Sequence, residues 1–230
     1  MQKDLPVNKI EEICESLQKK GLSINRYKHS SILIDSEPFK FADEKNLCIK
    51  QSANHTKNFI VKAPSGESCL IDYMSPNALE FVKKEINISK EKGFKKSAIN
   101  LLMNEPSHLC YGDCNAKNNL ENQLKLPFFP SYKGNILEKY TLPLSCFQNG
   151  DESLNFLNMH NIYSLQECRN YYKAMIDSGV KRPLVISRSM FPGTQQYAGK
   201  WLGYLEASWF GLKMSLIQTM INNVILILYI

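Results

Sequence analysis

The feature that most constrains the fold is an alternation of helical and extended apolar patterns along the chain. Polar helix-starting signals near residues 8, 75, 164 and 208 are each followed by apolar side chains at helical spacing, and short apolar runs separate these segments. An alternation of helices and buried strands predicts an α/β fold with a parallel sheet and right-handed crossovers. Such a sheet is either doubly wound or part of a (β/α)8 barrel.

The candidate strands are short apolar runs that end in polar residues. The sequence predicts strands within 30–36, 59–64, 97–104 and 182–189, and a last strand at 224–230. The polar residues after these runs are "ID", "MNEPS" and "SRSMFPG". Because the carboxyl ends of barrel strands carry the chemistry of that fold, this clustering favours a barrel.

The helices are predicted from their starting signals. We expect capping boxes at two helix starts, a serine followed by proline at another, and a serine cap on a last helix that runs to about Met220. The residues concerned are Asn8 with Glu11, Ser164 with Glu167, Ser75 with Pro76, and Ser208. The stretch from Glu105 to about Met159 is rich in Asn, Pro and Lys, and we expect it to be one long inserted loop.

Composition excludes several function classes. The 230 residues suit one domain, and the net charge of +6 comes from lysines spread along helix faces, which is typical of a solvated surface and not of nucleic-acid binding. No Gly-rich phosphate loop appears, so nucleotide chemistry is unsupported. No signal peptide is recognisable at the start, and the apolar tail 224–230 is too short to span a membrane.

Seven cysteines leave one unpaired under any full disulfide scheme. Cys110 and Cys114 are the close pair, and they would form a loop disulfide only if the chain is secreted, an alternative that the sequence leaves open. A zinc site is not expected, because a second close pair of Cys or His is missing. The N-glycosylation patterns at Asn54 and Asn87 are subject to the same condition of secretion.

Five segments resemble one known family in order and spacing. They are "GESCLIDYMSPNALEFVKKE" (66–85), "MNEPSH" (103–108), "HNIY" (160–163), "RPLVISRSMFPGTQQYAGKWLG" (182–203) and "ASWFGLKMSL" (207–216). These segments resemble glycoside hydrolase family 31, the type of lysosomal α-glucosidase, sucrase-isomaltase and maltase-glucoamylase. The resemblance covers nearly all of residues 1–230. It implies a partial (β/α)8 TIM barrel, roughly strands three to six of the catalytic barrel with their helices and one long loop at about 105–159.

The resemblance implies a retaining α-glucosidase that hydrolyses O-glycosyl bonds without a cofactor. Such an enzyme needs two carboxyl groups about 5 to 5.5 Å apart, one as nucleophile and one as acid and base. Aligned on "MNE", the family's nucleophile position holds Leu102, and its acid/base position holds Tyr204. Leucine cannot attack a sugar, and a phenol is a weak proton donor in acidic solution. The chain is therefore predicted to be catalytically inactive.

Part of the family's substrate pocket is retained. The resemblance implies substrate-binding roles for Met103, Arg188 and Trp201, beside the turn 191–193, whereas a tryptophan of the sugar pocket is replaced by Ala63. From the residues alone, Arg188 either grips a sugar hydroxyl or pairs with a structural carboxylate, and Trp201 either stacks on a ligand or fills the core.

Three other side chains near these positions could bear on activity. His160 is expected to be structural. Glu105 and Glu206 are the nearby carboxylates, but neither is expected to replace the lost pair, because each is displaced along the chain from the position it would have to take.

Three hypotheses follow for the function. The chain is a silent descendant of a family 31 α-glucosidase, or an active one of which this sequence is an imperfect fragment, or a non-catalytic carbohydrate- or partner-binding protein on the same half barrel. The expected partners are an α-glucoside or related glycan, if the pocket survives, and a protein that covers exposed barrel edges. The family implies a lysosomal, secreted or membrane-surface location.

Overall fold

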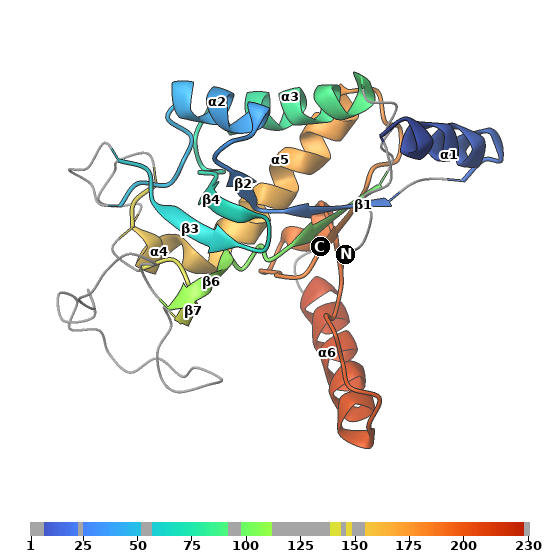
Figure 1. Cartoon of the computed structure of the whole chain (residues 1–230). Helices are drawn as coiled ribbons and strands as arrows, with labels where there is room; N and C mark the ends of the chain where they lie inside the picture. The colour runs from blue at the N-terminus through green and yellow to red at the C-terminus, as the bar shows by residue number, and fades with distance from the viewer. Residues whose placement is uncertain are drawn as a thin grey trace.

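The computed structural model describes residues 7–22, 25–51, 57–91, 98–111, 139–143, 146–148 and 155–227. Its centre is a parallel sheet with the strand order β1-β5-β8-β9 (Figure 1). These strands are β1 (Asn25–His29), β5 (Ala98–Leu102), β8 (Leu184–Ser187) and β9 (Gly199–Lys200). The α/β architecture with a parallel sheet, predicted from the sequence, is confirmed.

Two antiparallel groups stand beside the parallel sheet. The strand order of the larger group is β2-β4-β3, with β2 (Ser31–Leu33), β3 (Ile60–Ala63) and β4 (Gly66–Leu70). The strands predicted within 30–36 and 59–64 therefore exist, but they are antiparallel partners of β4 and not members of the parallel sheet. The smaller group pairs β6 (Ser107–Tyr111) with β7 (Lys139–Thr141).

The described part of the chain contains six α-helices. They are α1 (Val7–Lys19), α2 (Glu37–Glu44), α3 (Ala78–Glu91), α4 (Phe156–Met159), α5 (Tyr163–Asp177) and α6 (Trp209–Ile227). In Figure 1, α2 and α3 lie over α5, which also contacts β8, whereas α6 extends away from the rest of the described chain. Short 3-10 helices occupy His160–Ile162 and Thr194–Gln196.

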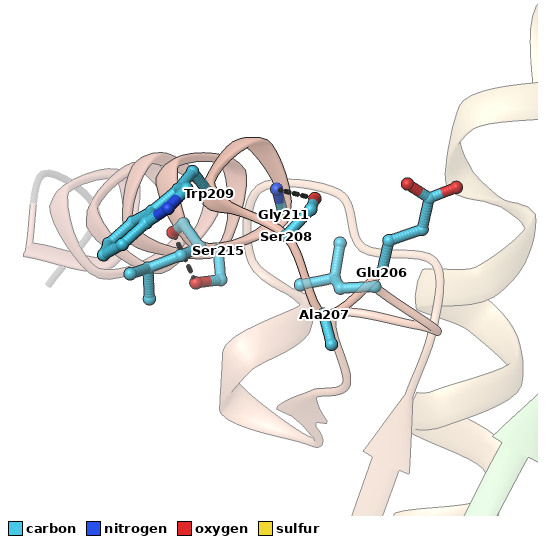
Figure 2. A pocket seen from close by; sticks show the side chains of 8 residues that line it. Glu206, Ala207, Ser208, Trp209, Gly211 and Ser215 are labelled. Atoms are coloured by element: carbon cyan, nitrogen blue, oxygen red, sulfur yellow. Dashed lines mark hydrogen bonds between the residues drawn. The ribbon is translucent and has the colours of Figure 1, made fainter.

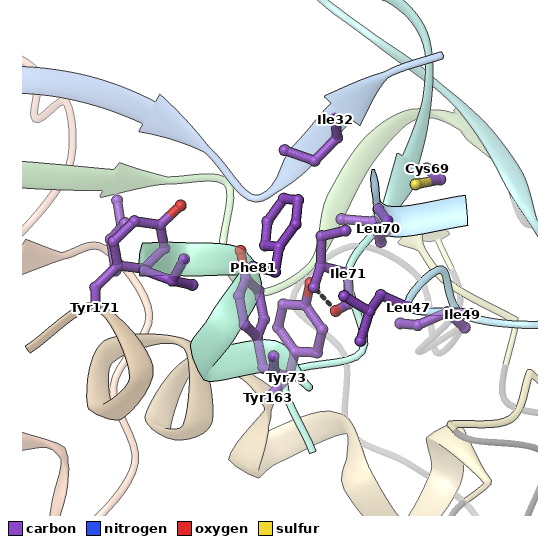
Figure 3. Packing of buried hydrophobic residues seen from close by; sticks show 14 of the residues in the cluster. Ile32, Leu47, Ile49, Cys69, Leu70, Ile71, Tyr73, Phe81, Tyr163 and Tyr171 are labelled. Carbon is purple, nitrogen blue, oxygen red and sulfur yellow. Dashed lines mark hydrogen bonds between the residues drawn. The ribbon is translucent and has the colours of Figure 1, made fainter. Parts of the chain in front are cut away.

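The core lies between the sheet and helices α3 and α5. The side chains of Phe81, Val82 and Ile86 lie on the inner face of α3, because residues three and four apart share one face of a helix. The Tyr163 hydroxyl donates a hydrogen bond of 2.9 Å to the Ile71 carbonyl, so this buried phenol has a polar partner (Figure 3). Tyr73 packs edge-on against Tyr163, with ring centroids 5.5 Å apart.

Several helix and loop predictions were wrong. The last strand was predicted at 224–230, but residues 224–227 continue α6 past Met220, and residues 228–230 lie outside the described part of the chain. Asn8 and Ser164 lie inside α1 and α5 and are not caps. Ser75 Oγ does accept a hydrogen bond of 3.3 Å from the Asn77 amide, as a cap would, but α3 begins at Ala78, later than the Ser75 signal predicted. The Ser208 cap is confirmed, since its Oγ accepts a hydrogen bond of 3.0 Å from the Gly211 amide.

The predicted loop 105–159 is a loop only in part. Within it, β6 and β7 form an antiparallel pair and α4 forms a short helix, while residues 112–138 lie outside the described part. A five-residue strand such as β6 needs a partner that is distant in sequence, and the local composition gave no sign of one.

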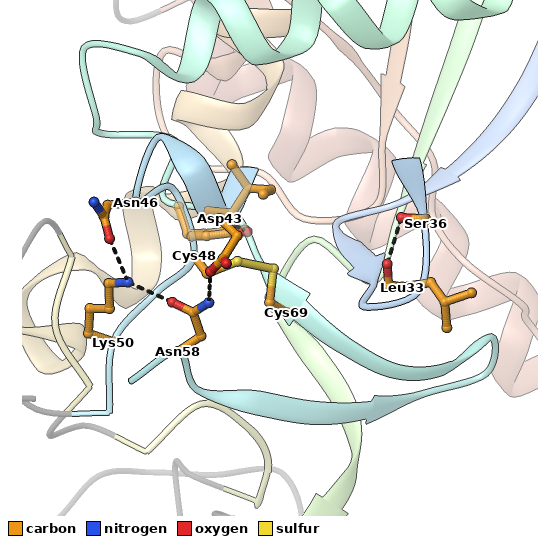
Figure 4. The surroundings of a disulfide bond; sticks show 10 residues. Leu33, Ser36, Asp43, Asn46, Cys48, Lys50, Asn58 and Cys69 are labelled. Atoms are coloured by element: carbon orange, nitrogen blue, oxygen red, sulfur yellow. Dashed lines mark hydrogen bonds between the residues drawn. A yellow bond between two sulfur atoms is a disulfide. The ribbon is translucent and has the colours of Figure 1, made fainter. Parts of the chain in front are cut away.

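A disulfide joins Cys48 to Cys69 across 21 residues and ties the segment before Lys50 to β4 (Figure 4). Beside it, Lys50 Nζ donates to Asn58 Oδ1 at 2.6 Å, and Asn58 Nδ2 donates to Asp43 Oδ1 at 2.7 Å. The sequence did not predict this pairing, because the two cysteines are far apart in the chain. The candidate pair of Cys110 and Cys114 cannot be compared with it, since Cys114 lies outside the described residues.

Two further sequence expectations concern single sites and the membrane. Asn87 of the glycosylation pattern is exposed on α3, whereas Asn54 lies outside the described residues. Among the helices in the described ranges, none combines the length and hydropathy needed to cross a membrane.

Candidate functional site

A tight turn follows β5 at the carboxyl edge of the sheet and carries the "MNE" motif. Met103 adopts a left-handed backbone conformation with φ of 55°, which costs a non-glycine residue about 1 to 2 kcal/mol. Buried Asn104 holds the turn in place, because its Nδ2 donates to Ser187 Oγ at 2.6 Å and its Oδ1 accepts from the Ser189 amide at 2.9 Å. The turn after β5 is thus fixed to the end of β8.

Glu105 and Arg188 form a two-point ion pair across this edge. Arg188 Nε donates to Glu105 Oε2 at 3.1 Å, and Arg188 Nη2 donates to Glu105 Oε1. Ser107 Oγ also donates to Glu105 Oε1, at 2.5 Å. Both carboxylate oxygens are therefore occupied, and Arg188 has the carboxylate partner that was one of its two predicted alternatives.

Other titratable side chains lie around this ion pair. Lys200 Nζ donates to the Arg188 carbonyl, and desolvation lowers the pKa of Lys200 against the opposing effect of Glu105. Desolvation, together with Lys28 and Arg188, lowers the pKa of His29. The edge therefore combines two cations and one carboxylate with a histidine that stays neutral at physiological pH.

His160 is half-buried in the 3-10 helix before α5, and its Nε2 is buried without a hydrogen-bond partner in the described residues. Its Nδ1 lies 3.1 Å from Asn161 Oδ1, and its ring packs edge-on against Phe156 with centroids 5.1 Å apart. Burial lowers the pKa of His160, while the contact with Asn161 and the charge of Glu105 oppose that shift. The ring packing fits a structural role, but the unpartnered Nε2 does not, so the structural role of His160 stays a prediction.

Two aromatic residues follow β9 in a segment without regular structure. Trp201 is half-buried, and its amide donates to the Ser187 carbonyl at 2.9 Å. Tyr204 is 93% exposed and meets the Trp201 ring edge-on, with centroids 5.2 Å apart. Trp201 therefore neither fills the core completely nor stands free as a platform.

A shallow hollow of about 460 Å³ lies farther along the chain, where the 205–208 segment meets the start of α6. Its lining includes Glu206, Trp209 and Leu212. Figure 2 shows the Glu206 carboxylate pointing away from Trp209, and this side chain is exposed. On β3, Ala63 is buried beside Gly66 and offers no aromatic wall.

Within the described part of the chain, no cluster of three His, Cys, Asp or Glu side chains is arranged to hold a metal ion. Arg188, Lys200 and Glu105 supply hydrogen bonding and charge pairing at this edge of the sheet, and Trp201 supplies aromatic contact.

Residues 2–230 match the family model of the glycosyl hydrolases family 31 TIM-barrel domain. The chain belongs to glycosyl hydrolase family 31. The family resemblance predicted from the five motifs is confirmed, and so, in its coarser form, is the fold: an α/β unit with a parallel sheet that matches a portion of the family 31 barrel.

Two curated family 31 relatives illustrate the extent of the match. Lysosomal alpha-glucosidase of Mus musculus is 36% identical over 115 residues, which are 49% of this chain and 11% of the relative. Intestinal sucrase-isomaltase of Suncus murinus is 28% identical over 183 residues, which are 77% of this chain and 10% of the relative. The chain thus spans about a tenth of the length of these two relatives.

Solved structures support the family 31 fold independently. The crystal structure of glucosidase II alpha subunit, in its DNJ-bound form, superposes with a TM-score of 0.66 at 22% identity. The superposition covers 88% of this chain and 19% of that chain. At this identity the likeness establishes the fold alone.

The sequence analysis did not predict the contacts of two residues, Asn104 and Lys200, at the carboxyl edge of the sheet. Asn104 could have been found, because a buried amide in a polar turn directly after a strand is a common device for fixing strand ends. Nothing local in the sequence marks Lys200, whose contact with Arg188 depends on how β8 and β9 pair.

Proposed function

We propose that this chain is a catalytically silent member of the α-glucosidase type of family 31. The observation that carries the proposal is the absence of a carboxyl group at the two positions that the family resemblance assigns to catalysis. Leu102 stands at the nucleophile position and Tyr204 at the acid/base position. Retaining hydrolysis needs a carboxylate to attack the sugar and a carboxylic acid to protonate the leaving oxygen.

The nearby carboxylates do not supply a replacement. Glu105 has both oxygens engaged by Arg188, and a lone pair that accepts such a hydrogen bond is a poor nucleophile. If Glu105 acted as the nucleophile, its ion pair with Arg188 would break and the strained turn at Met103 would have to move. Glu206 is exposed to water, and its carboxylate points away from Trp209 across the hollow beside α6, so no pocket holds it against a substrate.

A non-catalytic glycan-binding role is the second candidate, and one observation favours it. Trp201 and Tyr204 present aromatic surface in the segment after β9, whose Trp201 amide is bonded to the residue before Arg188, at the sheet edge where barrels bind their ligands. An aromatic ring offers an apolar face to a sugar, while a guanidinium offers hydrogen bonds to hydroxyl groups. Saturable maltose binding without turnover, lost in a Trp201→Ala variant, would favour this role.

The test of silence restores the missing groups. The hydrolysis of a chromogenic α-glucoside is measured for a Leu102→Asp, Tyr204→Asp double variant between about pH 4 and pH 7, beside the unaltered chain. The matched control is the Leu102→Asn, Tyr204→Asn variant, which has the same side-chain size without a carboxyl. Activity in the aspartate variant alone would support the proposal, and activity in the unaltered chain would contradict it.

A further inference from the structure

A carboxyl group that the candidate site does not use is buried between α5 and the sheet. Glu167 lies on the inner face of α5 with none of its surface exposed. Ser30 Oγ donates to its Oε2 at 3.0 Å, whereas its Oε1 meets no hydrogen-bond partner in the described residues. The sequence had assigned Glu167 to a capping box, so its position in the core is a correction.

Ser30 connects this carboxyl to two strand ends. It follows β1 directly, and its amide donates to the carbonyl of Leu102, the last residue of β5, at 3.3 Å. The Asn104 amide also lies close enough to Glu167 to influence its ionisation. One side chain on α5 thus holds the ends of β1 and β5 and borders the turn that carries the "MNE" motif.

Titratable groups face Glu167 from each element packed around it. These groups are Lys28 of β1, Tyr73 after β4, and Tyr163, Cys168 and Tyr171 of α5 itself. Lys28 is the cation among them, but its Nζ is already 3.0 Å from Glu85 Oε1. Glu167 therefore has neighbouring hydroxyl groups and a cation that another carboxylate has paired.

We propose that Glu167 is a proton-dependent clamp: its neutral carboxyl holds α5 against the ends of β1 and β5 in acidic solution, and its ionisation weakens that packing as the solution becomes neutral to alkaline. A neutral carboxyl fits this environment, because a buried charge needs a partner of opposite charge or several hydrogen bonds. Ionisation releases the proton of Glu167 to solvent and leaves a buried carboxylate whose Oε2 accepts from the Ser30 hydroxyl and whose Oε1 has no hydrogen-bond partner in the described residues.

The direction of the pH effect follows from the burial. Burial raises the pKa of Glu167 from 4.5 to about 7, against the opposing effects of Ser30, Tyr73, Lys28 and Asn104. In the unfolded chain the same group ionises near its ordinary value. The contribution of Glu167 to stability is therefore complete below about pH 4.5 and is lost as the pH rises through about 7.

Urea unfolding of the full chain tests the clamp. Between about pH 5 and about pH 8, the unfolding equilibrium constant of the unaltered chain should rise about 70-fold more than that of a Glu167→Gln variant. Glutamine has nearly the same shape as the protonated acid and does not titrate. The matched control is Glu80→Gln on the exposed face of α3, which should keep the pH dependence of the unaltered chain.

Two results would overturn the clamp. In the first, the Glu167→Gln variant follows the unaltered chain at both pH values. The second comes from infrared spectroscopy of the unaltered chain, and it tests the clamp even if the Glu167→Gln substitution prevents folding. At about pH 6, where ordinary carboxyl groups are mostly ionised, the folded unaltered chain should show the infrared carbonyl band of a protonated carboxylic acid, and that band should fade by about pH 8.5. Its absence at the lower pH contradicts the proposal.

Discussion

At the residue scale, the site depends on which side chain each polar group meets. Arg188 could have bound a ligand or a structural carboxylate, and its sequence neighbourhood is compatible with both. The outcome depends on Glu105, which is 83 residues away in the chain and is brought to it by the pairing of β5 with β8. Side-chain partners at this distance follow from the fold, so sequence patterns can suggest them but cannot decide between them.

The Glu105 and Arg188 pair makes a prediction about stability. Replacing Glu105 by Gln removes a two-point, charge-assisted contact in which each side chain is about one third exposed. We expect the free energy of unfolding to fall by about 1 kcal/mol, since solvent screens part of the attraction. Urea unfolding measures this loss, and the exposed Glu206→Gln variant serves as control. Equal stability of the two variants would show that the pair contributes nothing.

At the element scale, the sequence predicted buried strands well and the ends of apolar helices poorly. The strands β5 and β8 are short apolar runs bounded by polar turns, and both lie where they were predicted. The apolar run 224–230 is predicted as a strand, but its described part, 224–227, belongs to α6, because a short run of this kind cannot be told from a helix by its periodicity. The strand β1, "NRYKH", was missed because it is polar and is defined by its pairing with β5.

The disulfide makes a prediction at the same scale. A Cys48→Ala, Cys69→Ala variant should lose about 3 kcal/mol of unfolding free energy, because the bond closes a loop across 21 residues in the unfolded chain. Urea unfolding with and without a reducing agent provides the measurement. The reductant should lower the stability of the unaltered chain toward that of the variant and leave the variant unchanged. Insensitivity of the unaltered chain would argue against this pairing.

At the scale of the whole molecule, α6 is the feature that the rest of the described chain does not cover (Figure 1). Among the α6 side chains up to residue 222, seven large apolar ones are exposed: Trp209, Phe210, Leu212, Leu216, Ile217, Met220 and Ile221. Contiguous apolar surface of this kind promotes association in water. The relatives are several times longer than this chain, and a protein that covers its exposed barrel edges stays a prediction from the sequence.

Solubility tests the effect of α6. We expect the isolated chain to associate as its concentration rises, and a Leu216→Lys, Met220→Lys variant to associate less, because both side chains are exposed and lysine is hydrated. Light scattering over a concentration series measures the difference. The matched control is Lys83→Gln on α3, which leaves α6 unaltered. An unaltered chain that stays monomeric at all concentrations would contradict the prediction.

The central claim of catalytic silence is tested most directly by the turnover of a chromogenic α-glucoside by the unaltered chain, beside a Glu105→Gln, Glu206→Gln variant. Since the proposal assigns the two catalytic positions to Leu102 and Tyr204, which carry no carboxyl group, neither protein should release product faster than buffer. Turnover by the unaltered chain that disappears in the variant would contradict the claim and would identify a surrogate carboxylate at Glu105 or Glu206.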